Sequence, residues 1–402
     1  MRILWVSIEP PYPANTGGRL GIWNRLKRLA KEHEVYYFHT YDGEDEAHIP
    51  QLEELCAQVY SIRRKKTFAL IPRMIRYPYT VASRCMSEME QAIDDCIRQN
   101  DIQLINLDFP HMCAVVEKAA KKYGIPVVLN EHNIEWKVYR QISASADSPV
   151  KRLVYYVDSW RLKWYEERIV RRIKPKGITF VSQENLKEYA QWLRPSWAAL
   201  KLIPVGIESD VVCVPNDCGC RSIAFFGKMS YEPNVEGAIW FAQEVFPTVK
   251  AAIPGVKLYI VGMDPTDQVK ALACNDVIVT GTVLEVASYY ERANLVVIPL
   301  LHGDGVKVKL LEAISYGNQI VSTTKGVEGT DFASNSMIPV SDNPVLFAQL
   351  CIDRLQNPER YADERKQAFD YCMEHYTWDG ICRNYSDFLM GIEAESNGKD
   401  IY

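Results

Sequence analysis

The fold is decided by the stretch Pro299-Leu-Leu-His-Gly-Asp-Gly-Val-Lys-Val-Lys-Leu-Leu-Glu-Ala-Ile-Ser-Tyr-Gly317 of this 402-residue chain. It overlaps the end of an apolar run, residues 294–301, that predicts a buried parallel strand. A glycine-bracketed turn then leads into a helical pattern that ends at Gly317. A strand, a glycine turn and a helix N-terminus predict an anion site, because free backbone N–H groups and the helix dipole point the same way.

Two carboxylates and two lysines lie in this stretch. Asp304 is in the turn, Glu312 follows eight positions later, and Lys307 and Lys309 lie between them. This set suits a ligand that carries both phosphates and hydroxyls, such as a sugar nucleotide. A plainer interpretation is a solvated Glu312 in an ordinary i,i+3 ion pair with Lys309. Spacing alone leaves both interpretations open.

Composition is typical of a soluble globular enzyme with two or three domains: 48% of residues are hydrophobic and 24% are charged. No apolar run approaches the roughly 20 residues of a membrane helix. The eleven cysteines include no CxxC pair, and the cluster Cys213, Cys218 and Cys220 lacks a fourth zinc ligand. Reduced thiols in a cytosolic protein explain them better than a metal site.

Charge is divided unevenly along the chain. Residues 1–204 carry a net charge of +7 and the remainder carries −12. A basic front half and an acidic back half suggest two domains that meet different partners. The overall charge of −5 and the lack of a recognisable nucleic-acid-binding motif argue against a nucleic-acid partner.

Strands alternate with helices twice over, which predicts an α/β fold with two doubly wound parallel sheets. The predicted strands of the front half cover residues 2–8, 34–39, 104–107, 126–130 and 177–181. Those of the back half cover residues 221–227, 257–261, 277–280, 294–299 and 319–323, with helices at 234–250 and 306–316. We expect an N-terminal domain at 1–204, a linker at 205–220, a second domain at 221–375 and a helical tail at 376–402.

Ligands bind beyond the carboxyl ends of the strands in open α/β sheets, so the loops there are candidate site loops. In the front half Gly17, Gly18 and Arg19 follow the first strand. Paired glycines and a helix N-terminus suit a phosphate, and an arginine can add a bidentate contact. The order is not GxGxxG, so a strict dinucleotide fold is unsupported. A plain strand-to-helix turn remains an alternative.

Polar residues follow two later strands of the front half. Asp108 and His111 follow one strand, and Glu131-His132-Asn133 follows the next. They are candidate catalytic groups, although a lone histidine in such a loop is more often a structural hydrogen-bonder.

Glycines end several strands of the back half. Three strands end at a glycine: Gly227, Gly262 and Gly281. Lys228 follows the first of these glycines, and another glycine loop covers residues 324–329. Their missing side chains leave room for a flat base or a ribose.

These stretches resemble the GT-B glycosyltransferases of family 4 over nearly the whole chain. The matching residues are 11–19, 131–134, 181–182, 203–207, 225–234, Gly262 and, most strongly, 299–321. Seven residues separate the family's two carboxylates, as they separate Asp304 and Glu312. The resemblance implies that Glu312 holds the nucleotide ribose, and that Asp304 with the following amides holds the donor sugar. It also implies that Lys228 and Lys309 neutralise the diphosphate, and that the tail packs back on the N-terminal domain.

The resulting predicted donor-binding set is Gly17, Gly18, Arg19, Gly227, Lys228, Gly262, Gly281, Gly303, Gly305, Val306, Lys309 and Glu312. The candidate catalytic residues are Asp304, Glu312, Asp108, His111 and His132.

Three positions depart from the family pattern. Asp304 replaces the usual Glu, which shortens its reach by one methylene. Asn234 stands where many members have a second lysine, and Asp108 stands where a histidine is common. The roles of the front-half residues are therefore left open.

We expect a retaining transfer from a nucleotide sugar, UDP- or GDP-linked, that needs no metal. The acceptor is expected to be a saccharide or a lipid-linked sugar, bound on the basic front domain, in the assembly of a surface polysaccharide. A nucleotide-sugar epimerase of the same fold and a non-catalytic partner of another glycosyltransferase remain alternatives.

Two basic segments rich in apolar and aromatic residues, 63–75 and 151–176, could lie on an anionic membrane surface. For the second, an aromatic face packed into the core is an equal alternative. We therefore expect a cytoplasmic protein that can be peripheral at the inner face of a membrane.

Overall fold

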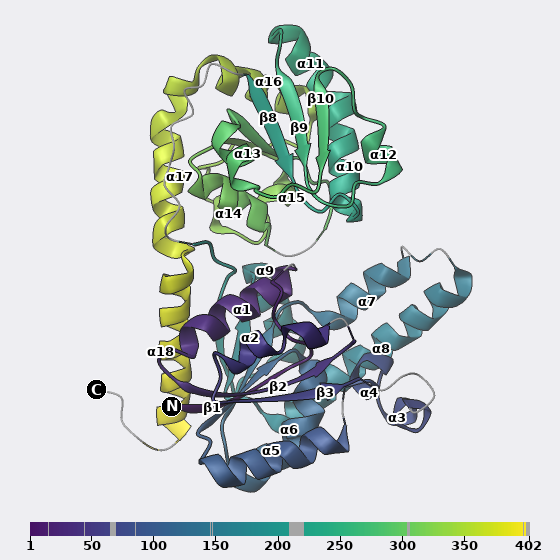
Figure 1. Ribbon diagram of the computed structural model, residues 1–402, viewed down its shortest axis with the longest axis vertical. Helices are drawn as coiled ribbons and strands as arrows, with labels where there is room; N and C mark the ends of the chain where they lie inside the picture. The colour runs from purple at the N-terminus through teal and green to yellow at the C-terminus, as the bar shows by residue number, and fades with distance from the viewer. Residues whose placement is uncertain are drawn as a thin grey trace. The chain divides into compact units, whose positions relative to one another are not determined.

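The computed structural model describes the chain except Asn15, Glu44, residues 65–69, Cys85, Ser145, Asp147, residues 209–220, Asp304, Gly305, Asn397 and residues 399–402. The chain forms two compact units. Unit 1 comprises Met1–Pro204 and Cys382–Tyr402, and unit 2 comprises Val205–Ile381. Each unit is a parallel sheet with helices, as the alternation of patterns predicts (Figure 1).

The sheet of unit 1 has seven parallel strands in the order β3-β2-β1-β4-β5-β6-β7. Their bounds are β1 (Arg2–Ser7), β2 (Glu34–Tyr41), β3 (Gln58–Arg63), β4 (Leu104–Asp108), β5 (Val127–Glu131), β6 (Gly177–Phe180) and β7 (Ala199–Leu202). The sequence patterns missed the edge strands β3 and β7. Both are only partly buried, so their polar residues weaken the apolar signal on which strand prediction depends.

Helices cover both faces of this sheet (Figure 1). They are α1 (Gly17–Leu29), α2 (Pro50–Glu53), α3 (Ile71–Arg76), α4 (Tyr79–Ala82), α5 (Ser87–Asn100), α6 (Cys113–Tyr123), α7 (Glu135–Ala144), α8 (Pro149–Ile173) and α9 (Gln183–Leu193), with short turns η1 (Asp45–His48) and η3 (Pro110–Met112). Alternate strand residues such as Leu4, Ile105 and Leu129 pack with α5, α6, α8 and α9 in one apolar core.

Helix α1 begins at Gly17, directly at the paired glycines. Thr16 caps it, because its Oγ1 accepts the backbone N–H of Arg19 at 3.3 Å. Gly17, Gly18 and Arg19 therefore form the first turn of the helix rather than a loop before it.

Helix α18 (Trp378–Ser396) starts in unit 2, and its residues from Cys382 onward belong to unit 1. Tyr385 donates from its hydroxyl to the side-chain oxygens of Asn106 and Asn130, both at 2.7 Å. A Cβ on Gly177 would lie 2.7 Å from the ring of Phe388, so β6 also packs closely on this helix. The tail thus covers the face of the sheet opposite the apolar core.

The sheet of unit 2 has five parallel strands in the order β10-β9-β8-β11-β12. Their bounds are β8 (Ser222–Phe226), β9 (Lys257–Val261), β10 (Val277–Gly281), β11 (Leu295–Ile298) and β12 (Gln319–Ser322). The helices are α10 (Glu232–Trp240), α11 (Phe246–Ala252), α12 (Asp267–Lys270), α13 (Ala287–Arg292), α14 (Val308–Ser315), α15 (Thr324–Val327), α16 (Pro344–Gln356) and α17 (Ala362–His375), with short turns η4 (Phe241–Val245), η5 (Asp331–Ala333) and η6 (Pro358–Tyr361).

The helix predicted over residues 234–250 is divided in three. Between α10 and α11, η4 is a π-helical turn. Pro247 has no N–H to donate to the preceding turn, so the regular ladder cannot run through it.

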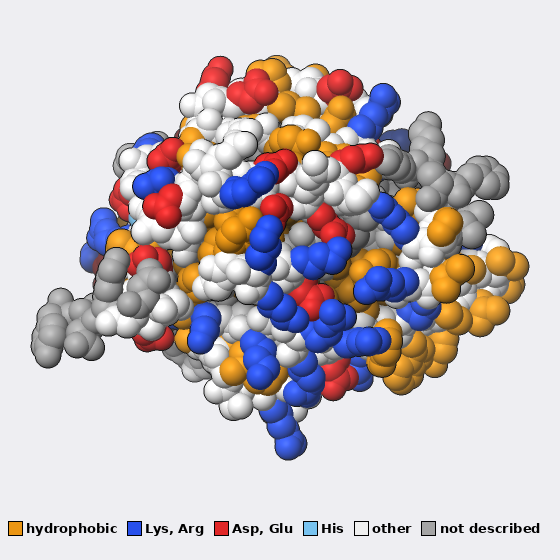
Figure 2. Space-filling view, turned by 90° about the horizontal axis from the view of Figure 1, so that it is seen from below, with side chains coloured by type: hydrophobic (Ala, Val, Ile, Leu, Met, Phe, Trp, Pro, Cys, Tyr) orange, Lys and Arg blue, Asp and Glu red, His pale blue; other side chains and the backbone are white. Residues whose placement is uncertain are grey.

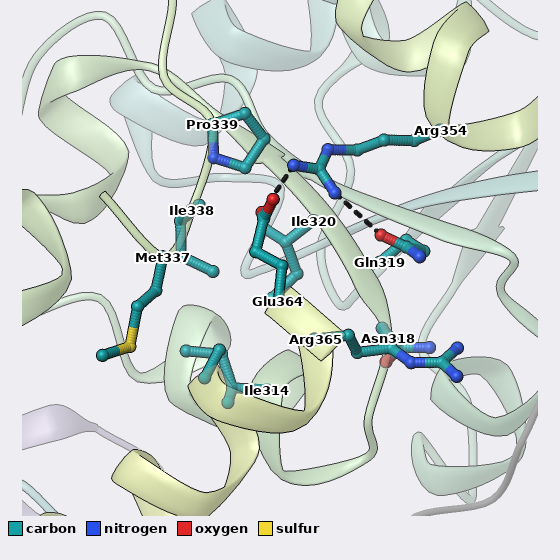
Figure 3. Close-up of a pocket in the computed structure, with 11 residues that line it drawn as sticks. Ile314, Asn318, Gln319, Ile320, Met337, Ile338, Pro339, Arg354, Glu364 and Arg365 are labelled. Carbon is teal, nitrogen blue, oxygen red and sulfur yellow. Dashed lines mark hydrogen bonds and ion pairs between the residues drawn. The ribbon is translucent and has the colours of Figure 1, made fainter. Parts of the chain in front are cut away.

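A small cavity of about 10 Å³ lies at the start of β12 (Figure 3). Beside it the Arg354 guanidinium donates to Gln319 at 2.9 Å and to Glu364 at 2.6 Å. This pairing fixes α16 and α17 to the sheet. The cavity has room for about one water molecule, so it is a structural feature and not a ligand site.

Three buried glutamates interact electrostatically in unit 1: Glu131 ends β5, Glu135 begins α7, and Glu166 lies in α8. Tyr189 donates to Glu131 at 3.3 Å, whereas no described residue hydrogen-bonds to the carboxyl oxygens of Glu166. Burial and mutual repulsion raise the pKa of Glu131 and Glu166 well above the ordinary value. Burial raises the pKa of Glu135 to about 7.

Replacing Glu135 by Gln should remove a loss of stability at neutral pH. In the unfolded chain Glu135 ionises near the ordinary glutamate pKa of 4.5, but in the fold its pKa is about 7. Because the folded pKa is raised, stability is fully present below pH 4.5 and falls as pH rises toward 7, by up to about 3 kcal/mol. Urea midpoints measured across this range should fall more steeply for the wild type than for E135Q.

Glu167→Gln, on the outer side of α8 and paired with Arg171, is the matched control and should keep the wild-type slope. Identical pH slopes for the wild type and E135Q would contradict the burial of a protonated Glu135.

Two helical glycines should respond oppositely to alanine. A Cβ on Gly237 in α10 would lie 2.7 Å from the backbone oxygen of Pro299, whereas nothing lies within 4 Å of a Cβ on Gly21 in α1. Gly237→Ala should lose about 1–3 kcal/mol through overpacking. Gly21→Ala should gain about 0.5–1 kcal/mol through helix propensity. Urea unfolding midpoints measure both changes. If both variants were stabilised, or both destabilised, the close packing of α10 on the end of β11 would be refuted.

Candidate active site

Two glycine turns meet at the carboxyl ends of β8 and β9. A Cβ on Gly262 would overlap the carbonyl oxygen of Gly227. A Cβ on Gly227 would lie 2.6 Å from Asn234 Nδ2 and 2.7 Å from Lys309 Nζ. Only glycine fits either position, so bare backbone lines this part of the sheet edge beside a lysine.

Lys309, in the first turn of α14, is half-buried and has one close polar partner among the described residues. Its Nζ donates to Asn234 Oδ1 at 2.6 Å and lies 4.7 Å from the centre of the Phe225 ring. Asn234 in turn donates to the backbone oxygen of Lys228 at 2.9 Å. Loss of hydration, with the nearby charge of Lys307, lowers the pKa of Lys309 to about 7. Within the described part of the chain, no carboxylate forms an ion pair with this cation.

Glu312 lies one turn further along α14 and accepts the hydroxyl of Tyr290 at 3.0 Å. Tyr290 is fully buried in a stack, 3.7 Å from the Phe226 ring and 5.0 Å from the Tyr316 ring. Burial raises the pKa of Glu312, while Tyr290 and Lys309 act to lower it. The stack fixes one oxygen of the carboxylate. Sequence reasoning missed Tyr290, because a contact across 22 positions leaves no local pattern.

The turn before α14 holds two predicted residues, Asp304 and Gly305, that lie outside the described part of the structure. Its flanks are described. Gly303 has a φ of +103°, which favours glycine, and the Nζ of Lys307 donates to its carbonyl oxygen at 3.0 Å. The helix begins at Val308, two residues later than predicted. Val306 therefore precedes the helix and packs against Gly329, which follows the short helix α15.

The remaining predicted residues of this edge are less tightly held. Lys228 is exposed, and its Nζ lies 3.7 Å from Asp264 Oδ2. Gly281 has a φ of +68° and ends the edge strand β10. The structure thus brings Gly227, Lys309 and Gly262 together and places Gly281 two strands from β8.

In unit 1 the carboxylate of Asp108, at the end of β4, is completely buried. Trp5 Nε1 donates to it at 2.6 Å, Asn130 Nδ2 at 3.3 Å and Arg25 at 3.4 Å. Burial alone would raise the pKa of Asp108, but the hydrogen bond with His132, the charge of Arg25 and the Trp5 donor together hold it below its ordinary value. The sequence did not reveal Trp5 or Arg25, which come from β1 and α1.

His132 Nε2 lies 3.3 Å from Asp108 Oδ1 and 3.3 Å from Arg25. The Phe109 ring stacks on His132 at 4.4 Å, and a Cβ on Gly18 would lie 3.9 Å from Phe109. Phe109 has a φ of 66° and a ψ of 143°, a backbone region largely reserved for glycine. Such a conformation costs about 1–3 kcal/mol and is often found at functional sites.

His111 is brought near this cluster but not into it. It is buried, and its ring lies 6.3 Å from that of Phe109. Burial, with the positive charge of Arg84, lowers its pKa to about 3, so the ring is neutral at physiological pH. Arg19 pairs with Glu9 at 2.8 Å and with Asp45 at 3.0 Å within its own unit.

Comparisons with known proteins fit this architecture. A family model described as Glycosyltransferase Family 4 matches residues 17–211, and one described as Glycosyl transferases group 1 matches residues 220–357. An uncharacterized 44.6 kDa protein in the cps region of Klebsiella pneumoniae is 28% identical over 392 residues, which are 93% of this chain and 96% of that protein.

Solved structures share the fold over nearly the full length. Sucrose-phosphate synthase from Thermosynechococcus elongatus superimposes with a TM-score of 0.68 at 15% identity, covering 98% of this chain and 100% of that one. Anabaena HepE in complex with UDP and glucose gives a TM-score of 0.64 at 14% identity, covering 97% and 100%. With two family models that together cover most of its length, the chain belongs to the family 4 glycosyltransferases, which have the GT-B fold.

Proposed function

We propose that this glycosyltransferase moves a sugar from a UDP-linked donor to a saccharide or lipid-linked acceptor, with retention of configuration, during assembly of a cell-surface polysaccharide. The observation that carries the proposal is the corner of unit 2 where Lys309, Glu312 and the bare backbone of Gly227 lie at the carboxyl edge of the sheet. A cation, a positioned carboxylate and an open backbone suit the diphosphate and ribose of a nucleotide sugar.

Relatives support the choice of donor and pathway. Anabaena HepE is solved with UDP and with UDP-glucose, which favours uridine over guanosine for this chain. The Klebsiella relative lies in a cps region, which agrees with the surface-polysaccharide role expected from the sequence.

The chemistry we propose separates a sugar with oxocarbenium character from a departing diphosphate. Lys309, Lys228 and the backbone amides at the start of α14 would stabilise the charge on the diphosphate. A leaving phosphate oxygen would take the acceptor proton, so no general base is required. Asp304 and Glu312 are therefore not the acid and nucleophile of a glycosidase.

In unit 1 we assign Asp108 a positioning role. It is fully buried and already accepts three hydrogen bonds, so it is poorly placed to abstract a proton. It instead fixes the orientation of Arg25 and His132, and His132 is the better candidate for contact with the reacting sugar. His111 is assigned to packing at the turn after β4.

Replacing Glu312 by Ala should abolish donor binding, because the carboxylate that we assign to the ribose is gone. Tyr290→Phe should weaken binding about five- to tenfold, since one hydrogen bond of roughly 1 kcal/mol that orients the carboxylate is lost. Thermal stabilisation by a panel of nucleotide sugars measures both, because a ligand at 100 times its Kd adds about 2.7 kcal/mol.

Glu291→Ala, an exposed glutamate next to Tyr290 on α13, is the matched control and should bind like the wild type. Acceptor-dependent release of UDP, in the presence of EDTA, should accompany transfer. Sugar isomerisation without UDP release would point to an epimerase. An unchanged cellular glycan in an E312A strain would point to a non-catalytic partner.

Donor affinity should fall as pH rises above about 7. Lys309, with a pKa of about 7 in the free protein, loses its charge over this range while the diphosphate keeps its own. The loss should approach tenfold per pH unit until the pKa of the donor-bound state is reached. Titration calorimetry at several pH values measures this.

Lys309→Arg should flatten the profile, because a guanidinium stays charged. Lys270→Arg, at an exposed position on α12, should keep the wild-type profile. A flat profile in the wild type would remove Lys309 from the diphosphate site.

A further inference from the structure

Helix α8 has two apolar faces that point in opposite directions. One face, with Leu162, Tyr165 and Ile169, is buried in unit 1. The other leaves a row of side chains exposed by 48–71%, which we call the α8 stripe: Val150, Leu153, Val154, Val157, Trp160 and Trp164. Spacings of three, four and seven residues place the row along one side of the helix. Core packing therefore accounts for one face of α8 and leaves the other unexplained.

Cations border the stripe. Arg140 of α7 lies 4.9 Å from the Trp160 ring, Lys163 lies 5.8 Å from the same ring, and Arg168 lies 4.9 Å from the Trp164 ring. Of the described acidic residues of α8, Asp158 and Glu166 are buried, whereas Glu167, three positions after Trp164, is partly exposed and pairs with Arg171 at 3.5 Å. Figure 2 shows hydrophobic side chains gathered at the right, with Lys and Arg side chains beside them. Cations outnumber the one paired carboxylate around the stripe, so its exposed charge is mainly positive.

Helix α3 adds to this surface. Arg161 of α8 donates to the backbone oxygens of Met74 and Tyr77, which ties the end of α3 to α8. Ile75 between them is 84% exposed. The predicted basic segment at 63–75 falls partly outside the described residues, but its described end lies beside the stripe.

We propose that the α8 stripe docks on the surface of an anionic lipid bilayer. Aliphatic side chains can enter the acyl boundary, while tryptophans with stacked cations suit the level of the headgroup phosphates. A second copy of the chain is a poorer partner, because a twofold contact would bring the same cations face to face. The docking is superficial, since no described helix combines the length and apolarity that a bilayer span needs.

This inference rests on the proposed function only for its biological meaning, which is to bring the enzyme to a lipid-linked acceptor. Binding to vesicles needs neither donor nor acceptor. A protein that docks but transfers no sugar would refute the proposed function and leave this inference standing.

The test is flotation of the full-length protein with vesicles of phosphatidylglycerol and phosphatidylcholine. The stripe variant L153S/V157S/W160S should bind roughly ten times more weakly than the wild type, through lost apolar contact. The charge variant R140Q/R168Q should lose binding to the anionic vesicles, and high salt should weaken the wild type. Vesicles of pure phosphatidylcholine should bind little of the wild type or of either variant.

The control variant V345S/L346S changes two comparably exposed apolar residues on α16 and should float like the wild type. Equal urea unfolding midpoints for the wild type and the stripe variant would show that the variant is folded. Wild-type protein that stays in the dense fraction, or a stripe variant that floats equally well, overturns the proposal. If the wild type sediments as a dimer, the stripe variant sediments as a monomer and neither binds vesicles, the stripe is instead a contact with a second copy of the chain.

Discussion

A carboxylate that is completely removed from water must be surrounded by donors, and Asp108 imposes this requirement on unit 1. Its oxygens accept from Trp5 of β1, Arg25 of α1 and Asn130 of β5. The same asparagine, with Asn106, accepts the hydroxyl of Tyr385 on α18, whose ring lies under the Arg25 guanidinium at 5.2 Å. One buried charge therefore fixes the relation of three strands and two helices, and with it the orientation of His132.

The charged group at the sheet edge of unit 2, Lys309, has fewer partners than Asp108 among the described residues. Lys309 is held by one asparagine oxygen and an aromatic face, and the nearby carboxylate of Glu312 is already engaged by Tyr290. A buried carboxylate with several donors, such as Asp108, is held in one orientation. Lys309 has one hydrogen-bond partner among the described residues, which agrees with the anionic ligand of the proposed function. The buried charge of unit 1 thus holds structural elements together, whereas the charge of unit 2 has few partners among the described residues. Their chemistry differs although both are parallel α/β sheets.

The sequence predicted the two sheets because their central strands are buried on both faces and read as continuous apolar runs. The edge strands β3 and β7, half-exposed, gave no such signal. Glycine positions at strand ends were predictable, since Gly227 and Gly262 admit no side chain. Tyr290, Trp5 and Tyr385 were not, because each reaches its partner across 22 to 279 positions and nothing local marks the pairing. The helical conformation of Gly17 and Gly18 was not predicted, because the Thr16 cap outweighs the low helix propensity of two glycines.

The placement of α18 has a consequence for biosynthesis. Asn130 and Asn106 leave the ribosome 255 and 279 residues before Tyr385, whose hydroxyl hydrogen-bonds to both. During translation the nascent first unit has its sheet, one apolar layer and α1 on the opposite face, but the part of that face that α18 covers stays exposed until the codons beyond Cys382 are read. Of the two units, the one that begins first is thus completed last. A premature stop codon shortly before Cys382 would leave the part of the sheet under α18 exposed to water, and the polypeptide would be an accessible substrate for quality-control proteases.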